Sequence, residues 1–378
     1  MSGFRPRLRQ GYGAAGLTGV GRQVAAHGCM KYRSSVIALI GITPLLFAAN
    51  ALAAEKPPDL ARAQVWQATD IPSMNIKVGP TGPGGFPFRA EVDCAYLDKE
   101  LSGRSPKFAC MKAGDDELKV KYGGTNGEVY GEVAASRLLW ALGFGADHMY
   151  SIKVICHGCP EEFGGILREN GDRIFDPATI ERKMPGGLLS DKWSWKEIDA
   201  IDEEAGGAPL AHRDALKLMA VFLQHSDTKP AQQRLICLGV TEVTPGAVCD
   251  NPFVLIQDVG VTFGRATLFN GNTPSSMNLA GWSNTPVWKS ATGPCVGNLS
   301  KSFTGTLGEP VISEAGRQFL AGLLQQLTDA QIRDLFEVSR VTLRLREPGN
   351  AKSGFPTVDE WVTVFKQKRA EIVNRRCA

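Results

Sequence analysis

The chain has 378 residues, of which 43% are hydrophobic and 21% charged, and its formal net charge at pH 7 is +3. This composition is typical of a folded protein with a sizeable core, and it excludes a fully disordered chain. The net charge is small and no basic stretch is interleaved with aromatic residues. We therefore expect no nucleic-acid partner.

An export signal is predicted at residues 30–53. A basic region with Lys31 and Arg33 is followed by an apolar region and by the small-x-small sequence Ala-Leu-Ala. The apolar region is shorter than the roughly 20 residues that a membrane span needs, so we expect no permanent membrane span. Cleavage is expected near Ala53, which predicts a periplasmic or secreted protein. Residues 1–29 precede the signal, and we expect them to be a disordered upstream extension.

Eight of the nine cysteines follow this signal, and eight is an even number. In an oxidising compartment such a set forms disulfides more often than metal sites. Two pairs each flank a predicted connection between strands, but the sequence does not fix the connectivity. These two pairs are Cys94 with Cys110 and Cys237 with Cys249, and the other cysteines are Cys156, Cys159, Cys295 and Cys377.

The Cys156-His157-Gly158-Cys159 motif has a second interpretation, because C-x-x-C is also the spacing of thiol redox sites and His157 could lower a thiol pKa. Thioredoxin-like motifs open a helix, whereas residues 160–165 indicate a turn. A structural disulfide is therefore favoured. A thiol-disulfide protein using Cys156 and Cys159 remains an alternative, and a zinc half-site would lack a second pair of ligands.

The first part of the chain is predicted to be rich in strands. Residues 54–78 are polar and contain prolines, so we expect a linker, and residues 78–85 form a glycine and proline loop without the ending of a phosphate-binding P-loop. Alternating and helical hydrophobic patterns predict the elements that follow. These are strands at 88–96, 107–111, 117–122, 149–156 and 173–183 and a helix at 128–142.

The second part is predicted to be mostly helical. Residues 211–224 are apolar on nearly every helical face, which predicts a buried helix, and strands are predicted at 234–238 and 253–257. Capping-box patterns at Thr328 and Thr357 predict two further helices. The outline is an α+β fold with a small strand-rich region at 79–183 and a larger, mostly helical region at 184–378.

Two segments carry the residue types that phosphoryl transfer requires. The reaction needs a carboxylate for the acceptor hydroxyl, and a second carboxylate with an amide to hold magnesium. In protein kinases the first carboxylate and the amide are five positions apart, and the metal carboxylate starts a later Asp-Phe-Gly motif. Here Asp227 is followed five positions later by Gln232, and Asp258 starts Asp-Val-Gly after a predicted strand.

The phosphates of a nucleotide also require a fixed ammonium group, held by a glutamate of a neighbouring helix. Lys119 and Lys121 lie on the same face of the predicted strand 117–122, because side chains alternate along a strand. Either lysine could reach the phosphates. We favour Lys121 with Glu132 of the helix at 128–142, and Glu128 is the second candidate, one turn earlier on the same face.

These segments resemble the HipA-like and related atypical kinases, whose relatives include the phosphatidylinositol kinases and secreted kinases of the Golgi. The resemblance extends over residues 88–264, and it indicates an exported bacterial member. The matching segments are LSGRSPKF (101–108), LKVKYG (118–123), EVAASRLLWALG (132–143), HSDTKPAQQ (225–233) and QDVGVTFG (257–264).

The resemblance implies a two-lobed protein-kinase-like fold that transfers the γ-phosphoryl group of ATP, with Mg²⁺, to a hydroxyl acceptor. Asp227 would orient or deprotonate this hydroxyl, which belongs to a protein, a lipid head group or a small metabolite. Lys229 would stabilise charge on the transferred group, while Asp258 and Gln232 would bind the metal. The loop at 102–107 would cover the phosphates, and its candidate nucleotide-binding residues are Ser102, Gly103 and Lys107.

The chain departs from the family pattern at Gln232, where the family has asparagine. Glutamine presents the same carbonyl oxygen on a stem one methylene longer, so its backbone must lie farther from a metal. This departure leaves a second interpretation open, namely a catalytically silent kinase-like module that binds a nucleotide or a partner protein.

Overall fold

The computed structural model describes residues 58–377 except 270, 272–274 and 345–355. The expected upstream extension, signal peptide and cleavage site therefore lie outside the described residues. Among the helices of the described part, none is both long enough and apolar enough to cross a membrane.

A six-stranded sheet occupies the first half of the described chain, in the order β3-β2-β1-β5-β7-β6. Strands β1 and β5 are parallel, and the other pairs are antiparallel. Because β3 also pairs with β7, five of the strands form a closed ring. The strands are β1 (Glu91–Leu97), β2 (Lys107–Lys112), β3 (Asp116–Tyr122), β5 (His148–His157), β6 (Ile166–Leu167) and β7 (Arg173–Arg182).

The ring encloses its own hydrophobic core, since alternate side chains of each strand point inward. In β3, for example, Leu118 and Val120 belong to this core, and Lys121 lies on the opposite face. Aromatic residues fill much of the interior, with Phe108 packing against Phe175. The outward-facing Lys121 is therefore free to contact elements outside the ring.

A second, four-stranded sheet has the order β4-β10-β9-β8. Its strands are β4 (Gly145–Ala146), β8 (Gly187–Ser190), β9 (Gln233–Cys237) and β10 (Pro252–Ile256). The sequence did not predict β4 and β8, which are too short to show a clear alternation. Strands β9 and β10 are antiparallel with Gln233 opposite Ile256, so Gln232 and Gln257 meet at the edge of the sheet, where the Gln257 N–H donates to the Gln232 carbonyl.

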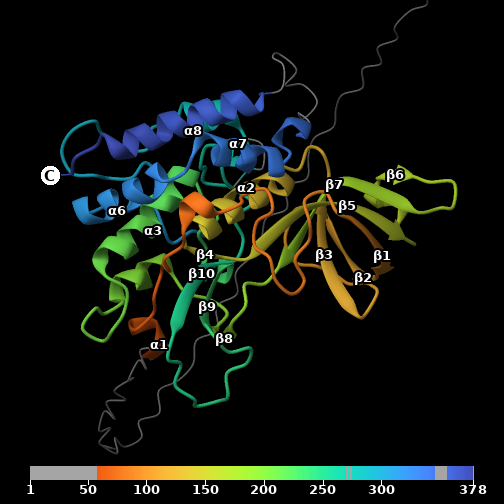
Figure 1. The fold of residues 1–378 in the computed structure, drawn as a ribbon, viewed down its shortest axis with the longest axis horizontal. Coiled ribbons are helices and arrows are strands. Elements are labelled where there is room, and N and C mark those ends of the chain that lie inside the picture. The colour runs from red at the N-terminus through yellow and green to blue at the C-terminus, as the bar shows by residue number, and fades with distance from the viewer. Residues whose placement is uncertain (1–57, 270, 272–274, 345–355, 378) are drawn as a thin grey trace, which may run out of the picture. The chain divides into compact units, whose positions relative to one another are not determined.

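Helices dominate the second half of the chain (Figure 1). Both capping boxes are confirmed, because Thr328 and Thr357 accept hydrogen bonds at the starts of α7 and α8. The helices are α1 (Pro58–Ala61), α2 (Glu128–Ala141), α3 (Leu210–Leu223), α5 (Leu279–Ser283), α6 (Glu314–Gln325), α7 (Asp329–Val338) and α8 (Val358–Val373), and the short 3₁₀ segments are η1 (Ile71–Ser73), η2 (Glu161–Phe163), η3 (Trp195–Ala200), η4 (Pro230–Gln232) and η5 (Val341–Leu343).

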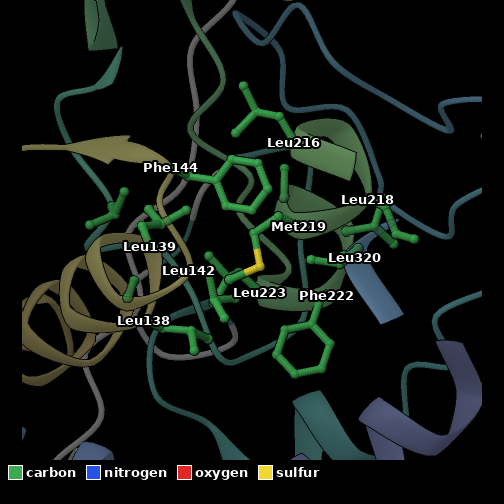
Figure 2. Close-up of a cluster of buried hydrophobic side chains, with 14 of the residues drawn as sticks. Leu138, Leu139, Leu142, Phe144, Leu216, Leu218, Met219, Phe222, Leu223 and Leu320 are labelled. Atoms are coloured by element: carbon green, nitrogen blue, oxygen red, sulfur yellow. The ribbon is translucent and has the colours of Figure 1, made fainter. Parts of the chain in front are cut away.

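Helices α2 and α3 share one large hydrophobic core. Figure 2 shows Leu138 and Leu142 of the α2 region converging with Met219 and Leu223 of α3. This packing fixes the helix that bears Glu132 relative to the helix that leads to Asp227. The described chain is a mixed protein of helices and sheets, and strands concentrate in its first half.

The interpretation of residues 54–78 as a linker is wrong for residues 58–78. Val65, Ile71 and Ile76 are buried in the large core, and isolated β-bridges join Gln64 to Phe253 and Trp66 to Phe144. The apolar residues of this segment follow neither a helical nor a strand period, because each is buried by contacts with distant parts of the chain. The hydrophobic pattern therefore did not indicate that this segment is buried.

All eight cysteines that follow the predicted signal form disulfides in the structure. The connectivity left open by the sequence is Cys94–Cys110, Cys156–Cys159, Cys237–Cys249 and Cys295–Cys377. Four disulfides are typical of a protein from an oxidising compartment, such as a periplasm or the extracellular space.

Candidate functional site

Lys121 projects from the outer face of β3 toward helix α2. The start of α2 is fixed to the neighbouring strand, since the Thr179 hydroxyl of β7 donates to the Val129 carbonyl at 2.6 Å. Glu128 and Glu132, one turn apart on α2, thereby come to lie over Lys121. The lysine is only 4% exposed.

Three carboxylates surround the Lys121 ammonium group. It donates hydrogen bonds to Glu132 Oε1 and, at 3.1 Å, to Glu128 Oε2, and it lies 3.8 Å from Asp258 Oδ1. Asp258 follows β10 of the second sheet, so the cluster joins the two sheets and α2. The carboxylate oxygens of Glu128, Glu132 and Asp258 lie within 4.8 Å of one another, which is a spacing that could hold a metal ion.

Two glycines allow the segment after Asp258 to pack directly on α2. A Cβ atom on Gly260 would lie 2.8 Å from Glu128 Cγ and 3.1 Å from Glu132 Cγ. A Cβ atom on Gly131 of α2 would lie 2.6 Å from the Gly260 carbonyl oxygen. The Gly260 N–H also donates to Asp258 Oδ1 at 3.2 Å, which orients this carboxylate.

The loop after α3 brings Asp227 to the same cluster. Gln224 ends the helix in the left-handed conformation, and the chain then runs through buried residues to Asp227. Asp227 Oδ2 accepts hydrogen bonds from Lys229 Nζ and Gln232 Nε2, each at 3.2 Å. Gln232 Nε2 also donates to Asp258 Oδ2 at 3.1 Å. One amide therefore links the two aspartates.

Burial and charge together set the ionisation of the cluster. Burial opposes the charge of Lys121, but Asp258, Glu132 and Glu128 outweigh it and raise the pKa of this lysine above its usual value. Burial also opposes the charge of Asp258, yet Lys121 and the Gly260 N–H hold its pKa well below the usual range. Burial raises the pKa of Glu132 to about 8, and Lys121 offsets this only in part. At neutral pH, Lys121 and Asp258 are thus charged.

Lys119 lies on the same face of β3 but is not a member of the cluster. Its ammonium group pairs with Glu181 of β7, and its side chain is 34% exposed. Of the two candidate lysines, the favoured one, Lys121, contacts Glu132.

The predicted phosphate-covering loop lies beside the cluster. Lys107 is directly opposite Lys121 in the β2–β3 pair. Burial, and then the nearby charge of Lys121, lower the pKa of Lys107. Gly103 has a φ of +95°, and a Cβ atom there would lie 2.8 Å from Lys107 Nζ. Ser102 is exposed next to it.

Sequence reasoning missed a second buried ion cluster, centred on Asp147. This residue lies between β4 and β5, where the chain crosses from the second sheet to the first. Its carboxylate accepts hydrogen bonds from Arg234 of β9, from Lys183 Nζ at 3.0 Å and from the Met184 N–H at 2.9 Å. Lys183 and Met184 lie in another crossing, between β7 and β8. An isolated aspartate in a sequence gives no sign of such a role.

The motif Cys156–Cys159 forms a disulfide at the end of β5. His157 Nδ1 lies 2.8 Å from Asp172 Oδ1, so its ring is oriented by a carboxylate. A separate hollow of about 780 Å³ is lined by Trp195, Lys217 and Thr306, among other residues.

No protein-family model matches the chain, and no curated protein matches it. Among solved structures, it is similar to the crystal structure of a Helicobacter pylori proinflammatory kinase, CtkA, at a TM-score of 0.39 and 8% sequence identity. This similarity covers 74% of the present chain and 94% of the CtkA chain.

Proposed function

We propose that the chain is an exported, two-lobed kinase-like protein that transfers the γ-phosphoryl group of ATP to a hydroxyl acceptor with Mg²⁺. The observation that carries this proposal is the convergence of Lys121, Asp227 and Asp258, which come from three distant segments, on one hydrogen-bonded cluster. The motif resemblance to the HipA-like and related atypical kinases supports it.

The proposed roles follow from the contacts. Glu132 holds the Lys121 ammonium group at a fixed position, as phosphate binding requires. Asp227 accepts the proton of the acceptor hydroxyl as the acceptor oxygen bonds to the γ-phosphorus. The bond from that phosphorus to the bridging oxygen then breaks, and ADP leaves. Lys229 stabilises negative charge on the transferred group, since it is partly exposed and its ammonium group is paired with Asp227.

The donor set fits a magnesium ion, which prefers carboxylate and amide oxygens. Asp258 has two suitable oxygens and its side chain is 24% exposed. Gln232 now turns its nitrogen to the aspartates, and a half-turn of its amide would present the oxygen instead. When bound, Mg²⁺ would neutralise charge on the phosphate oxygens.

A catalytically silent nucleotide-binding module is the second candidate, and one observation favours it. The Gln232 amide bridges Asp227 and Asp258, and three carboxyl groups enclose Lys121, so the side chains of the cluster already bind one another. A nucleotide would have to compete with these internal bonds.

An exported location belongs to the same proposal. The predicted signal at residues 30–53 and the four disulfides support it, since disulfides persist in oxidising compartments.

Phosphate transfer from radiolabelled ATP tests the proposal. Transfer to an acceptor, to the chain itself or to water is expected in the wild type and is expected to be lost in Asp227→Ala and Asp258→Ala. The matched control is Asp191→Ala, which alters an exposed aspartate. If ATP stabilises the wild type but no transfer to any acceptor or to water is found, the silent module is the correct interpretation.

A further inference from the structure

An exposed apolar surface lies close to the Asp227 loop. It consists of Leu268, Phe269 and Phe303, which are 50%, 78% and 80% exposed. The Phe303 N–H donates to the Leu268 carbonyl at 2.8 Å, so the two segments that carry these residues run side by side. Exposed aromatic residues gathered in this way mark interaction sites more often than isolated exposed residues do.

Direct hydrogen bonds connect the segment that carries Phe303 to the loop of the candidate site. The Thr306 hydroxyl and N–H both donate to the Thr228 carbonyl, at 2.8 and 3.1 Å, and the Leu307 N–H donates to Thr228 Oγ1 at 3.3 Å. Thr228 directly follows Asp227, and Thr306 is three positions from Phe303. A molecule bound on the apolar surface would therefore lie next to the proposed catalytic aspartate.

The charged residues that flank Leu268, Phe269 and Phe303 in the sequence are positive. The sequence contains no aspartate or glutamate between Asp258 and Glu309, although it contains Arg265 and Lys301. Both of these residues are exposed, and neither forms an ion pair with a residue that the structure describes. Lys229 adds a third, partly exposed cation from the Asp227 loop. An occupant with negative charges would complement this region.

We propose that this surface docks the acceptor of the phosphoryl transfer, and that the acceptor is an acidic polypeptide segment with apolar side chains near its hydroxyl. Phe269 and Phe303 would bury the apolar side chains, while Arg265 and Lys301 would pair with the carboxylates. Aromatic residues and arginine supply most of the binding free energy at many protein interfaces. The role as acceptor depends on the function proposed above, whereas the binding does not.

Peptide binding to the full chain tests the inference. The probe is a short fluorescent peptide with serine flanked by glutamate and phenylalanine, and fluorescence anisotropy measures its affinity. One control peptide has lysine in place of glutamate, and another has alanine in place of phenylalanine. We expect the acidic, apolar peptide to bind most tightly, and its affinity to fall as salt is added.

Two independent sets of variants locate the binding. Phe269→Ser with Phe303→Ser is expected to weaken binding of the acidic peptide by about tenfold or more. Arg265→Glu with Lys301→Glu is expected to shift the preference toward the lysine peptide. The matched control is Ile166→Ser, which removes another exposed apolar residue, on β6. It is expected to bind like the wild type.

Equal binding of the acidic and basic peptides, or wild-type binding by both sets of variants, would overturn the inference. Binding to vesicles of phosphatidylcholine and phosphatidylglycerol without binding to the peptide would assign the surface to a membrane, and would also overturn it. The thermal response to ATP is measured on the same samples. A normal response without peptide binding contradicts only this inference, whereas peptide binding without any response contradicts the proposed function.

Discussion

The Lys121 ammonium group lies 3.8 Å from Asp258 Oδ1, although one residue belongs to the first sheet and the other follows the last strand of the second. Helix α2 makes this contact possible, because its Glu128 and Glu132 bind Lys121 of the first sheet and its Gly131 packs against Gly260, just after β10. A basic residue of the first sheet and an acidic residue that follows the second sheet thus form one ionic site.

Lys121→Met is expected to destabilise the fold, because it removes the buried cation that contacts Glu128, Glu132 and Asp258. Removing one partner of a buried ion cluster costs about 3 kcal/mol or more in the free energy of unfolding. Urea denaturation followed by circular dichroism measures this loss. Lys119→Met is the matched control. It removes a lysine from the same strand and face whose partner, Glu181, keeps Lys183, so a loss below about 1 kcal/mol is expected. Equal losses for the two variants would show that the contacts of Lys121 stabilise the fold no more than the ion pair of Lys119 does.

Gly260→Ala is expected to push the Asp258 segment away from α2. The added Cβ would lie 2.8 Å from Glu128 Cγ, a separation that real side chains do not tolerate. We expect a lower melting temperature and a weaker response to ATP. Gly322→Ala in α6 meets no atom within 4 Å and should leave both unchanged or raise stability slightly, since alanine favours a helix. A wild-type melting temperature for Gly260→Ala would contradict the close packing.

Acid pH is expected to destabilise the fold through protonation of His148. Burial, and then the nearby charge of Arg137, lower the pKa of His148 to about 4. Because the folded pKa lies below that of the unfolded chain, the stabilising contribution is present above about pH 6.5 and is lost as the pH falls toward 4. His148→Gln should flatten the stability profile in this window, by on the order of 2 kcal/mol. Parallel profiles for variant and wild type would contradict this.

Removal of individual disulfides should have unequal effects. Cys295–Cys377 closes a loop of 82 positions, whereas Cys156–Cys159 closes one of only 3. In the loop-entropy model the first contributes about 4 kcal/mol and the second about 2. Double serine variants of each pair, compared by urea denaturation, should reproduce this order. The reverse order would show that Cys156–Cys159 contributes more to stability than its loop length explains.

Much of the fold could be predicted because the relevant patterns are local. The alternation of β3 placed Lys119 and Lys121 on one face, and the apolar run before Asp227 identified the buried helix α3. The contact of Lys121 with Glu132 was predicted as well, whereas the ion pair of Lys119 with Glu181 of β7 was not. Contacts between distant strands of this kind leave no trace in the spacing of residues.

The same reason explains the remaining differences. The segment at 58–78 is buried by partners far along the chain, so its sequence resembles that of a linker. Asp147 joins two of the crossings between the sheets, and nothing in its neighbourhood in the sequence indicates this. The meeting of Asp227, Gln232 and Asp258 was easier to expect, since their order and spacing resemble those of a protein-kinase motif.

We propose that Lys121, Asp227 and Asp258 form a magnesium-dependent nucleotide site. The most direct test is the melting temperature of the full chain, titrated with ATP in the presence and absence of Mg²⁺, for the wild type and for Asp258→Ala. We expect stabilisation that rises with ATP, requires Mg²⁺ and disappears in Asp258→Ala while Asp191→Ala retains it. No shift in the wild type, or an equal shift in Asp258→Ala, would contradict the proposed nucleotide site.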